Sequence, residues 1–144
     1  MGIREKYKKF FLAGLIEGEG TLTVVVRKRE NLKFGISVDP EFYLYQHKKR
    51  KKLLELAKQI FGTGSIYSKH GSKNALVFAI RDRRTIHEKV IPFFERYVLP
   101  FGVKYNAMFP YYKELVELMM QKAHLRKDGI AKLLKLVKRI RDLA

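Results

Sequence analysis

The chain has 144 residues, of which 47% are hydrophobic, so it is long enough to form one domain with a buried core. It contains no cysteine, which excludes disulfide bonds and thiolate metal sites. Its charged start and short apolar runs argue against a signal peptide and a membrane-spanning helix, and they predict a soluble, intracellular protein.

The chain is strongly basic, with 31 Lys and Arg residues against 14 Asp and Glu residues and a formal net charge of +17. These basic residues are spread along the whole chain. A folded domain this basic repels itself, and a polyanionic partner is the usual compensation. Nucleic acid is therefore the expected partner. Packing in a ribosome, an anionic membrane surface and the lysine enrichment of thermophilic proteins are the alternatives.

The start of the chain has the pattern of one helix followed by two strands. Residues 4–16 carry apolar side chains at helical spacing. Residues 21–29 alternate and are β-branched, and residues 34–46 alternate over a longer run, so both segments are predicted strands. Pro40 cannot donate a hydrogen bond to a neighbouring strand, which predicts a bulge or a sheet edge at that point.

A second helix–strand–strand unit follows. Residues 48–61 form an amphipathic pattern that Gly62 closes as a helix C-cap. Residues 62–82 then have the pattern of a turn and a hairpin, with the hairpin turn near Gly71.

The rest of the chain is predicted to be helical. The helix over residues 84–97 should break or kink at Pro92, and two further helices should cover residues 106–124 and 130–143. The predicted fold is therefore α+β, a single domain over residues 1–144. Its antiparallel sheet should carry the helices on one face and leave the other free.

The free face of the predicted sheet should carry polar and basic side chains. Arginine pairs with guanine, carboxylates accept from cytosine, and hydroxyls contact bases or phosphates. A two-stranded ribbon also fits the major groove, so this face is the predicted DNA-binding surface, with an ordinary solvated sheet face as the alternative. Its expected residues are Thr21, Thr23, Arg27, Arg29, Ser37, Asp39, Glu41, Tyr43, Tyr45, Ser65, Tyr67, Lys69, Lys73 and Arg81.

Two glycines, Gly14 and Gly18, lie four residues apart on one face of the first helix. Two such helices can pack backbone to backbone. Because the chain has one such helix, its partner should be a second copy, and a twofold axis would bring two Glu19 carboxylates together within a basic surface. Helix-end glycines and solvated glutamates are common, so this spacing alone does not establish a function.

The complete string over residues 12–20, LAGLIEGEG, resembles the LAGLIDADG motif of homing endonucleases, with Glu in place of both Asp residues and Gly in place of the second Ala. The αββαββα order, the FGTGSI turn and the chain length also resemble the single-motif, intron-encoded branch of that family, over about residues 4–123. The resemblance implies the homing-endonuclease fold with a saddle-shaped antiparallel sheet. It does not account for the last helix, from about residue 126. It also implies a homodimer whose interface contains Leu12, Ala13, Gly14, Leu15 and Gly18.

The resemblance implies catalytic residues position by position. Glu19 and the carbonyl of Gly18 would bind a divalent metal, Mg²⁺ with Mn²⁺ as a substitute. Gln46 would order water, Lys104 would lie beside the attacking water, and Arg50 would contact phosphate. Such chemistry requires a hard cation on carboxylate oxygen to neutralise an anionic phosphodiester.

The resemblance therefore predicts a site-specific homing endonuclease. It would act as a homodimer, make a metal-dependent double-strand break in a long, nearly palindromic DNA site and leave short 3′ overhangs. Its partners would be double-stranded DNA and a second copy, with no membrane and no small-molecule cofactor. An intron RNA maturase and a cleavage-inactive DNA-binding module of the same fold are the alternatives. Loss of the motif acid would favour either of them, and Glu19 is present.

Overall fold

Two helix–strand–strand units follow one another at the start of the chain, as the sequence pattern predicts. In the computed structural model, which describes residues 2–144, the first unit consists of α1 (Ile3–Glu19), β1 (Gly20–Lys28) and β2 (Ile36–His47). A 3₁₀ turn (Lys48–Arg50) then leads into α2 (Lys51–Phe61), β3 (Ser65–Ser68) and β4 (Ala75–Ile80). Gly62 closes α2 in the left-handed conformation at φ 73°, which confirms the predicted cap.

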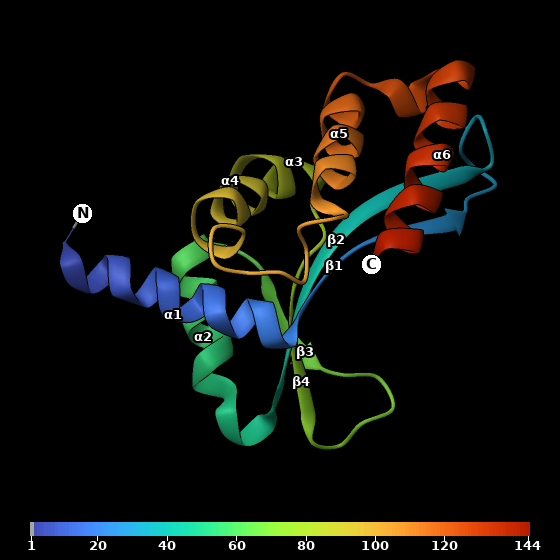
Figure 1. The fold of residues 1–144 in the computed structure, drawn as a ribbon. Coiled ribbons are helices and arrows are strands. Elements are labelled where there is room, and N and C mark those ends of the chain that lie inside the picture. The colour runs from blue at the N-terminus through green and yellow to red at the C-terminus, as the bar shows by residue number, and fades with distance from the viewer. Residues whose placement is uncertain (1) are drawn as a thin grey trace.

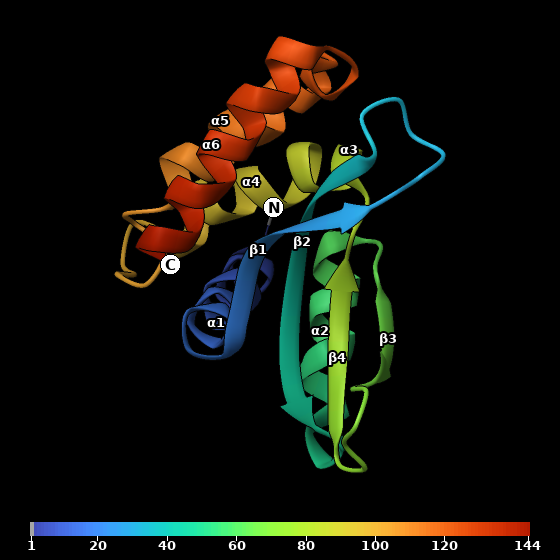
Figure 2. The same ribbon diagram turned by 90° about the vertical axis from the view of Figure 1, so that its right-hand side faces the viewer.

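The four strands form one antiparallel sheet in the order β1-β2-β4-β3. The long strand β2 joins its two halves, because it pairs with β1 over Ile36–Leu44 and with β4 over Phe42–His47. The helices lie on one side of the curved sheet (Figure 1), and the other side is open toward the viewer in Figure 2, with α2 behind β2 and β4. The predicted free face therefore exists.

Pro40 lies in the part of β2 that pairs with β1 along one edge and, within residues 2–144, has no partner strand along its other edge. It lies opposite Val24 of β1 in an unbroken register, whereas pairing with β4 begins only at Phe42. The prediction of an edge is therefore confirmed, and the alternative of a bulge is wrong.

A helical segment runs from Arg83 to Val98 without a break at Pro92. It consists of α3 (Arg83–Thr85) and α4 (Ile91–Phe93), with π-helical turns at Ile86–Val90 and Phe94–Val98. Pro92 lies at the start of α4, between these wider turns, so the predicted break is wrong. The next helix, α5 (Phe109–Met120), begins three residues later than predicted, because residues 104–108 form turns.

Alternation along the strands directs apolar side chains toward the helices. Phe42 is fully buried at the centre, with ring centroids of Phe61, Phe78 and Phe94 between 5.7 and 6.4 Å away. These rings come from β2, α2, β4 and the helical segment after β4. One aromatic cluster therefore packs α2 and that helical segment against the central strands of the sheet. Burying each such side chain contributes roughly 1.5–3 kcal/mol.

The last helix, α6 (Lys127–Leu143), packs against α5 and reaches the edge strand β1. Its guanidinium from Arg141 donates to the carbonyl of Val24 at 3.2 Å. The buried face contains Ile130, Leu133, Leu136, Val137 and Ile140, whereas Leu134 is exposed. The last helix is thus part of the domain core. Within residues 2–144, no helix is both long and apolar enough to cross a membrane.

We predict that the FGTGSI turn tolerates no side chain at Gly64. Gly64 has φ +110°, and a Cβ there would overlap the ring of Phe78. Gly71 also has a positive φ, of +79°, but its Cβ would meet nothing within 4 Å. Gly64→Ala should therefore lower the unfolding free energy by roughly 2–4 kcal/mol, and the control Gly71→Ala by about 1 kcal/mol. Equal losses in urea unfolding would contradict the predicted overlap.

Candidate nucleic-acid interface and metal site

The junction between α1 and β1 fixes the position of Glu19. The helix ends at Glu19, and the N–H of Gly20 donates back to the carbonyl of Ile16, which also accepts the hydroxyl of Tyr105 at 2.9 Å. A Cβ on Gly20 would lie 2.7 Å from the Ile16 oxygen and 2.9 Å from the Tyr105 oxygen, so the turn requires glycine. Burial raises the pKa of Tyr105, which keeps its hydroxyl a donor. The exposed carboxylate of Glu19 therefore projects from a rigid helix end.

Glu19 shares a cleft of about 360 Å³ with the predicted residues Gln46 and Arg50. Gln46 is the last but one residue of β2 and is 8% exposed, and its Oε1 accepts the Nε–H of Arg50 at 2.9 Å. This hydrogen bond fixes the amide orientation and leaves the Nε2 group of Gln46 as its donor. Lys69 lines the same cleft from beyond β3.

Three polar residues that line this cleft, His47, Ser72 and Asn74, are not among the residues that the sequence predicts for the site. His47 follows Gln46 directly, and its Nδ1 accepts the N–H of Lys49 at 3.1 Å, which starts the 3₁₀ turn. Ser72 and Asn74 lie in the β3–β4 turn, where polar residues are expected for conformational reasons alone. Only their position beside the end of β2 identifies them as part of the cleft. This position follows from the pairing of His47 with Ala75, the residue after Asn74.

Lys104 reaches the same junction from another direction. Its ammonium donates to the carbonyl of Gly20 at 2.7 Å, one residue after Glu19. Lys104 is not among the residues that line the Glu19 cleft, and it lies instead beside Thr21 and Tyr105. The structure thus brings Lys104 to the residue next to Glu19 but outside the cleft itself.

A single chain supplies only part of a metal site. Within residues 2–144 no group of three or more His, Asp or Glu side chains is placed to hold a metal ion. Glu19 offers its carboxylate, and the carbonyl of Gly18 belongs to the last turn of α1, whose carbonyls lack helical partners. These are hard oxygen donors of the kind that Mg²⁺ takes, typically with one or two carboxylates and several waters. The residues fit Mg²⁺ if further oxygens come from outside the chain.

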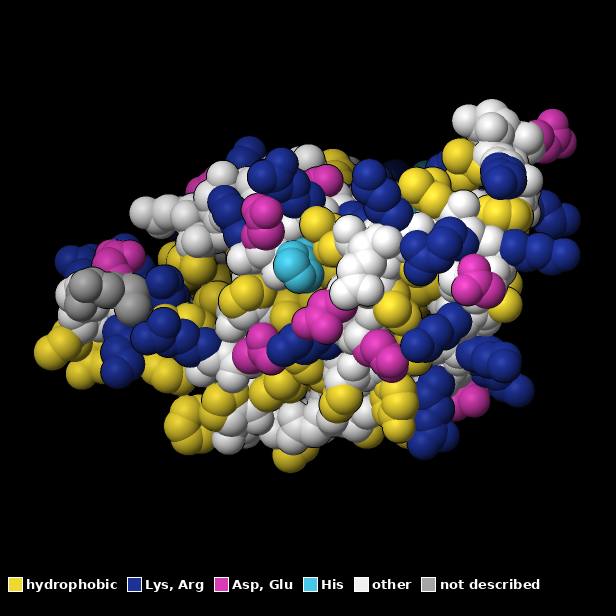
Figure 3. Space-filling view, turned by 90° about the horizontal axis from the view of Figure 1, so that it is seen from above, with side chains coloured by type: hydrophobic (Ala, Val, Ile, Leu, Met, Phe, Trp, Pro, Cys, Tyr) yellow, Lys and Arg dark blue, Asp and Glu magenta, His cyan; other side chains and the backbone are white. Residues whose placement is uncertain are grey.

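The predicted sheet-face residues that lie in strands share one face, because the register sets Thr21 opposite Tyr43, Thr23 opposite Glu41 and Arg27 opposite Ser37. Arg29, Lys69, Lys73 and Arg81 lie just beyond the strand ends. Their exposure differs. Thr21, Arg29, Ser65, Lys69, Lys73 and Arg81 are exposed, whereas Thr23, Arg27, Ser37, Asp39, Tyr43, Tyr45 and Tyr67 are partly buried. Basic side chains also spread over the face seen from above in Figure 3, so the positive charge is not confined to the sheet.

Glu41 is the exception, because it is buried at 2% exposure. Its carboxylate accepts the guanidinium of Arg27 at 2.9 Å and the hydroxyl of Tyr43. The expectation that Glu41 offers a free acceptor to a base is therefore wrong. The same guanidinium also contacts Asp39 at 2.8 Å, and these two carboxylates raise the pKa of Arg27.

Tyrosines and cations continue this network across the sheet. Arg81 donates to the hydroxyls of Tyr43 and Tyr67 and lies 5.5 and 5.2 Å from their ring centroids. Lys69 lies 5.0 Å from the ring of Tyr45. Burial, reinforced by Glu41, raises the pKa of Tyr43 to about 12, so it stays a donor at neutral pH. The face is therefore a pre-ordered surface of cations, hydroxyls and aromatic rings.

The exposed side of α1 differs from the predicted interface. Leu12 and Ala13 are buried in the chain's own core at 0% and 4% exposure, so their inclusion in an intermolecular interface is wrong. Gly14 and Gly18 are exposed, and a Cβ at either would meet nothing within 4 Å. Leu15 is partly buried. The large exposed apolar side chains near them are Ile3, Tyr7 and Phe11 on α1, and Phe101 and Val103 on the loop before α5.

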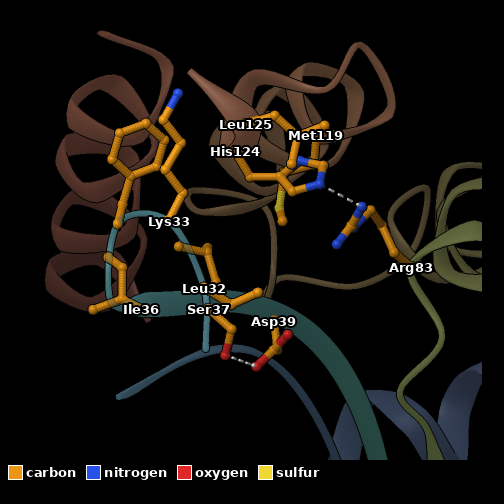
Figure 4. A pocket seen from close by; sticks show the side chains of 11 residues that line it. Leu32, Lys33, Ile36, Ser37, Asp39, Arg83, Met119, His124 and Leu125 are labelled. Carbon is orange, nitrogen blue, oxygen red and sulfur yellow. Dashed lines mark hydrogen bonds between the residues drawn. The ribbon is translucent and has the colours of Figure 1, made fainter. Parts of the chain in front are cut away.

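A second cavity, of about 300 Å³, lies between the β1–β2 loop and the α5–α6 connection (Figure 4). Its walls are largely apolar, with Leu32, Ile36 and Met119 among them, and it contains a contact of 3.1 Å between Arg83 Nη1 and His124 Nε2. Burial and the neighbouring Arg83 lower the pKa of His124. Glu19, Gln46 and Lys104 are not among its lining residues, so it is separate from the Glu19 cleft, although Ser37 and Asp39 of the sheet face line it.

Comparison with known proteins finds a matching family model and similar proteins. A family model described as LAGLIDADG endonuclease matches residues 12–115. DNA endonuclease I-CeuI of Chlamydomonas moewusii is 46% identical over 120 residues, which cover 81% of this chain and 54% of that protein. The chain thus spans about half the length of this relative.

Two solved structures have the same fold. The group I intron-encoded homing endonuclease I-CeuI complexed with DNA superposes with a TM-score of 0.89 at 38% identity, covering 93% of this chain and 66% of that chain. The archaeal intron-encoded homing endonuclease I-Vdi141I complexed with DNA gives 0.87 at 26% identity, covering 97% and 86%. The predicted homing-endonuclease fold is therefore confirmed.

We predict that Arg27 stabilises the sheet by neutralising Glu41. Arg27→Ala leaves a buried carboxylate without its cation and should lower the unfolding free energy by about 3 kcal/mol. Adding Glu41→Gln removes that charge and should recover part of the loss. The control Arg29→Ala removes an exposed side chain just after the end of β1 and should change stability by about 0.5 kcal/mol or less. A double variant less stable than Arg27→Ala in urea unfolding would contradict the pairing.

Proposed function

The chain belongs to the LAGLIDADG endonuclease family, and from this membership we propose that it is a site-specific DNA endonuclease that acts as a homodimer. The observation that carries the proposal is the position of Glu19. Its exposed carboxylate projects from the end of α1 into a cleft with Gln46 and Arg50, beside a sheet face built from cations and hydroxyls. Two of the similar solved structures are described as complexes with DNA, which supports the choice of DNA as the partner.

The sheet face has the chemistry that a DNA groove requires. Exposed Arg81 and Lys69 are each held over tyrosine rings, so their charges are ordered before any DNA arrives. Pre-ordered cations lose less side-chain entropy on binding than free ones do. With a formal charge of +17 per chain, a dimer carries 17 + 17 = +34, and phosphate contacts supply a large share of the affinity for DNA.

A second copy completes the site that one chain leaves partial. The exposed glycines of α1 allow the same helix of a partner to approach closely. Ile3, Tyr7 and Phe11 continue this face as an apolar stripe, which contact with a second copy would cover. Twofold pairing at Gly14 and Gly18 brings the two Glu19 carboxylates toward one another. One dimer then presents two carboxylates and two sheet faces to one duplex.

The residues around Glu19 have distinct roles in hydrolysis. Glu19 and the carbonyl of Gly18 would hold Mg²⁺, which when bound neutralises the charge of the phosphodiester and of its leaving oxygen. Gln46, fixed by Arg50, has a free Nε2 donor with which to position the attacking water. Lys104 places a cation beside the junction, where it can stabilise developing negative charge. Arg50 adds a contact for the phosphate backbone.

We predict that Glu19→Gln separates binding from cleavage. The substitution keeps the size of the side chain but removes the charge that binds the cation. On a duplex that the wild type cuts, affinity measured in Ca²⁺ should persist, while the single-turnover rate in Mg²⁺ should fall by roughly 100-fold or more. The control Glu114→Gln removes an exposed carboxylate from α5 and should leave the rate unchanged.

Three results would contradict the assignment in different ways. Glu19→Gln that cuts at the wild-type rate would place the metal site elsewhere. A wild type that binds a selected DNA site but never cuts it in Mg²⁺ would be a binding module. A wild type that prefers a structured intron RNA to every DNA tested would favour the maturase alternative.

We also predict that Gly14→Leu abolishes the dimer without unfolding the chain. A side chain at Gly14 meets only open space in one chain, and replacing a helix glycine should raise chain stability by up to about 1 kcal/mol. The same side chain blocks close approach of a second α1, so sedimentation at micromolar concentration should show a monomer that does not cut both strands. The control Ala131→Leu adds the same bulk to the exposed face of α6 and should stay dimeric. A Gly14→Leu variant that remains a dimer would rule out this crossing point.

A further inference from the structure

Glu17 is the second glutamate of the motif, and the proposed chemistry gives it no role. Its side chain points toward the loop after the helical segment 83–98. There Oε2 accepts the backbone N–H groups of Val103 and Lys104, both at 2.9 Å. One carboxylate oxygen thus accepts two consecutive N–H groups, which belong to residues 86 and 87 positions after Glu17 in the sequence.

The loop is shaped to receive this carboxylate. The N–H of Gly102 donates to the carbonyl of Val98 at 2.9 Å, and the side-chain amide of Asn106 donates to the carbonyl of Gly102 at 2.9 Å. A Cβ on Gly102 would clash with Glu17 Oε1 and lie 2.7 Å from the Val98 oxygen. Glycine at this position is therefore what lets the loop lie against the Glu17 carboxylate.

The loop grips the end of α1 through three consecutive residues. Val103 and Lys104 bind Glu17 through their N–H groups, the Lys104 ammonium binds the carbonyl of Gly20 at 2.7 Å, and the Tyr105 hydroxyl binds the carbonyl of Ile16 at 2.9 Å. In the sequence these contacts lie on both sides of Glu19, at Ile16 and Glu17 before it and at Gly20 after it. We call residues 102–105 together with Glu17 the clasp.

The clasp also carries a cost. The second oxygen of Glu17, Oε1, is buried without a hydrogen-bond partner. An unsatisfied buried carboxylate oxygen lowers stability. The arrangement therefore orders the loop but leaves one acceptor oxygen of Glu17 unsatisfied. Such local losses of stability are expected at functional sites.

We propose that Glu17 is a positioning residue that holds the Lys104 ammonium at the Gly20 carbonyl, one residue after Glu19, by fixing the backbone of residues 103 and 104. This inference rests on the proposed endonuclease function. Without Glu17 the loop loses both backbone hydrogen bonds to the end of α1 and keeps those of the Lys104 and Tyr105 side chains, so the ammonium spends less time at the Gly20 carbonyl. Glu19 supplies the charge for the reaction, and Glu17 sets the position of the cation at the following residue, Gly20.

A double-mutant cycle on the single-turnover cleavage rate tests this role. Glu17→Ala in the wild-type background should lower the rate by about 10–100-fold, the size of effect expected from a misplaced catalytic group. In the Lys104→Ala background the same substitution should change the rate less than twofold, because the group it positions is absent. An equal loss in both backgrounds would overturn the proposal, since a general structural defect acts regardless of Lys104.

Two further variants separate the clasp from the loss of a carboxylate. Glu17→Gln keeps an acceptor oxygen for the two N–H groups and should restore most of the rate. Gly102→Ala keeps Glu17 but displaces the loop and should reproduce the loss. The control Glu95→Gln removes an exposed carboxylate paired with Lys113 and should leave the rate unchanged.

Amide hydrogen exchange on the DNA-free protein tests the clasp independently of cleavage. The Val103 and Lys104 amides should be protected in the wild type and should exchange at least tenfold faster in Glu17→Ala. Unchanged protection would overturn the clasp even if the enzyme cuts DNA. If the wild type cuts no DNA, the proposed function fails, and the exchange result still decides whether Glu17 fixes the loop.

Discussion

The carbonyl of Ile16 is the point on which the site depends. It accepts the N–H of Gly20, which ends the helix, and the hydroxyl of Tyr105, which ties that end to the loop before α5. Neither bond could form in this way with a side chain at residue 20. The helix therefore stops at Glu19, the strand starts at once, and the motif carboxylate is fixed at the boundary between the helix layer and the open sheet face.

The sequence presents two glutamates within a strongly basic chain, and the structure gives them opposite environments. Glu17 is bound by two backbone N–H groups of its own chain, whereas Glu19 opens into a cleft. On the sheet face, Glu41 and Asp39 are both bound by Arg27. Glu19 is instead an accessible carboxylate in a cleft that also contains Arg50 and Lys69, which is the arrangement that a metal bridging to phosphate requires.

The local features of the fold could be predicted because they depend on neighbours in the sequence. The alternation of side chains in β1 and β2 predicts the correct sheet faces. Two glycines, which the structure shows at positive φ, mark the helix cap and the hairpin turn in the sequence. The motif string gave Glu19, and the end of β2 gave Gln46, which the structure brings into the same cleft.

Other features depend on contacts between distant segments, and the sequence pattern could not supply them. Glu41 has the parity of an exposed residue but is covered by the long side chains of Arg27 and Tyr43. Leu12 lies in the motif that predicts an interface, yet the fold of its own chain buries it. The role of Glu17 requires a loop 86 residues away. Pro92 was expected to break or kink its helix, but the helical segment continues through it between two π-helical turns, and such turns leave no clear signal in the sequence.

The central claim is that two copies of this chain place their Glu19 carboxylates about a twofold axis on one duplex. Selection of cleaved sequences from a random DNA library in Mg²⁺ tests this claim most directly, because it gives activity, target and symmetry together. We expect a long site of nearly palindromic sequence, cut on both strands at positions related by the same twofold axis. An asymmetric site nicked on one strand, or no enrichment of any cleaved sequence, would contradict it.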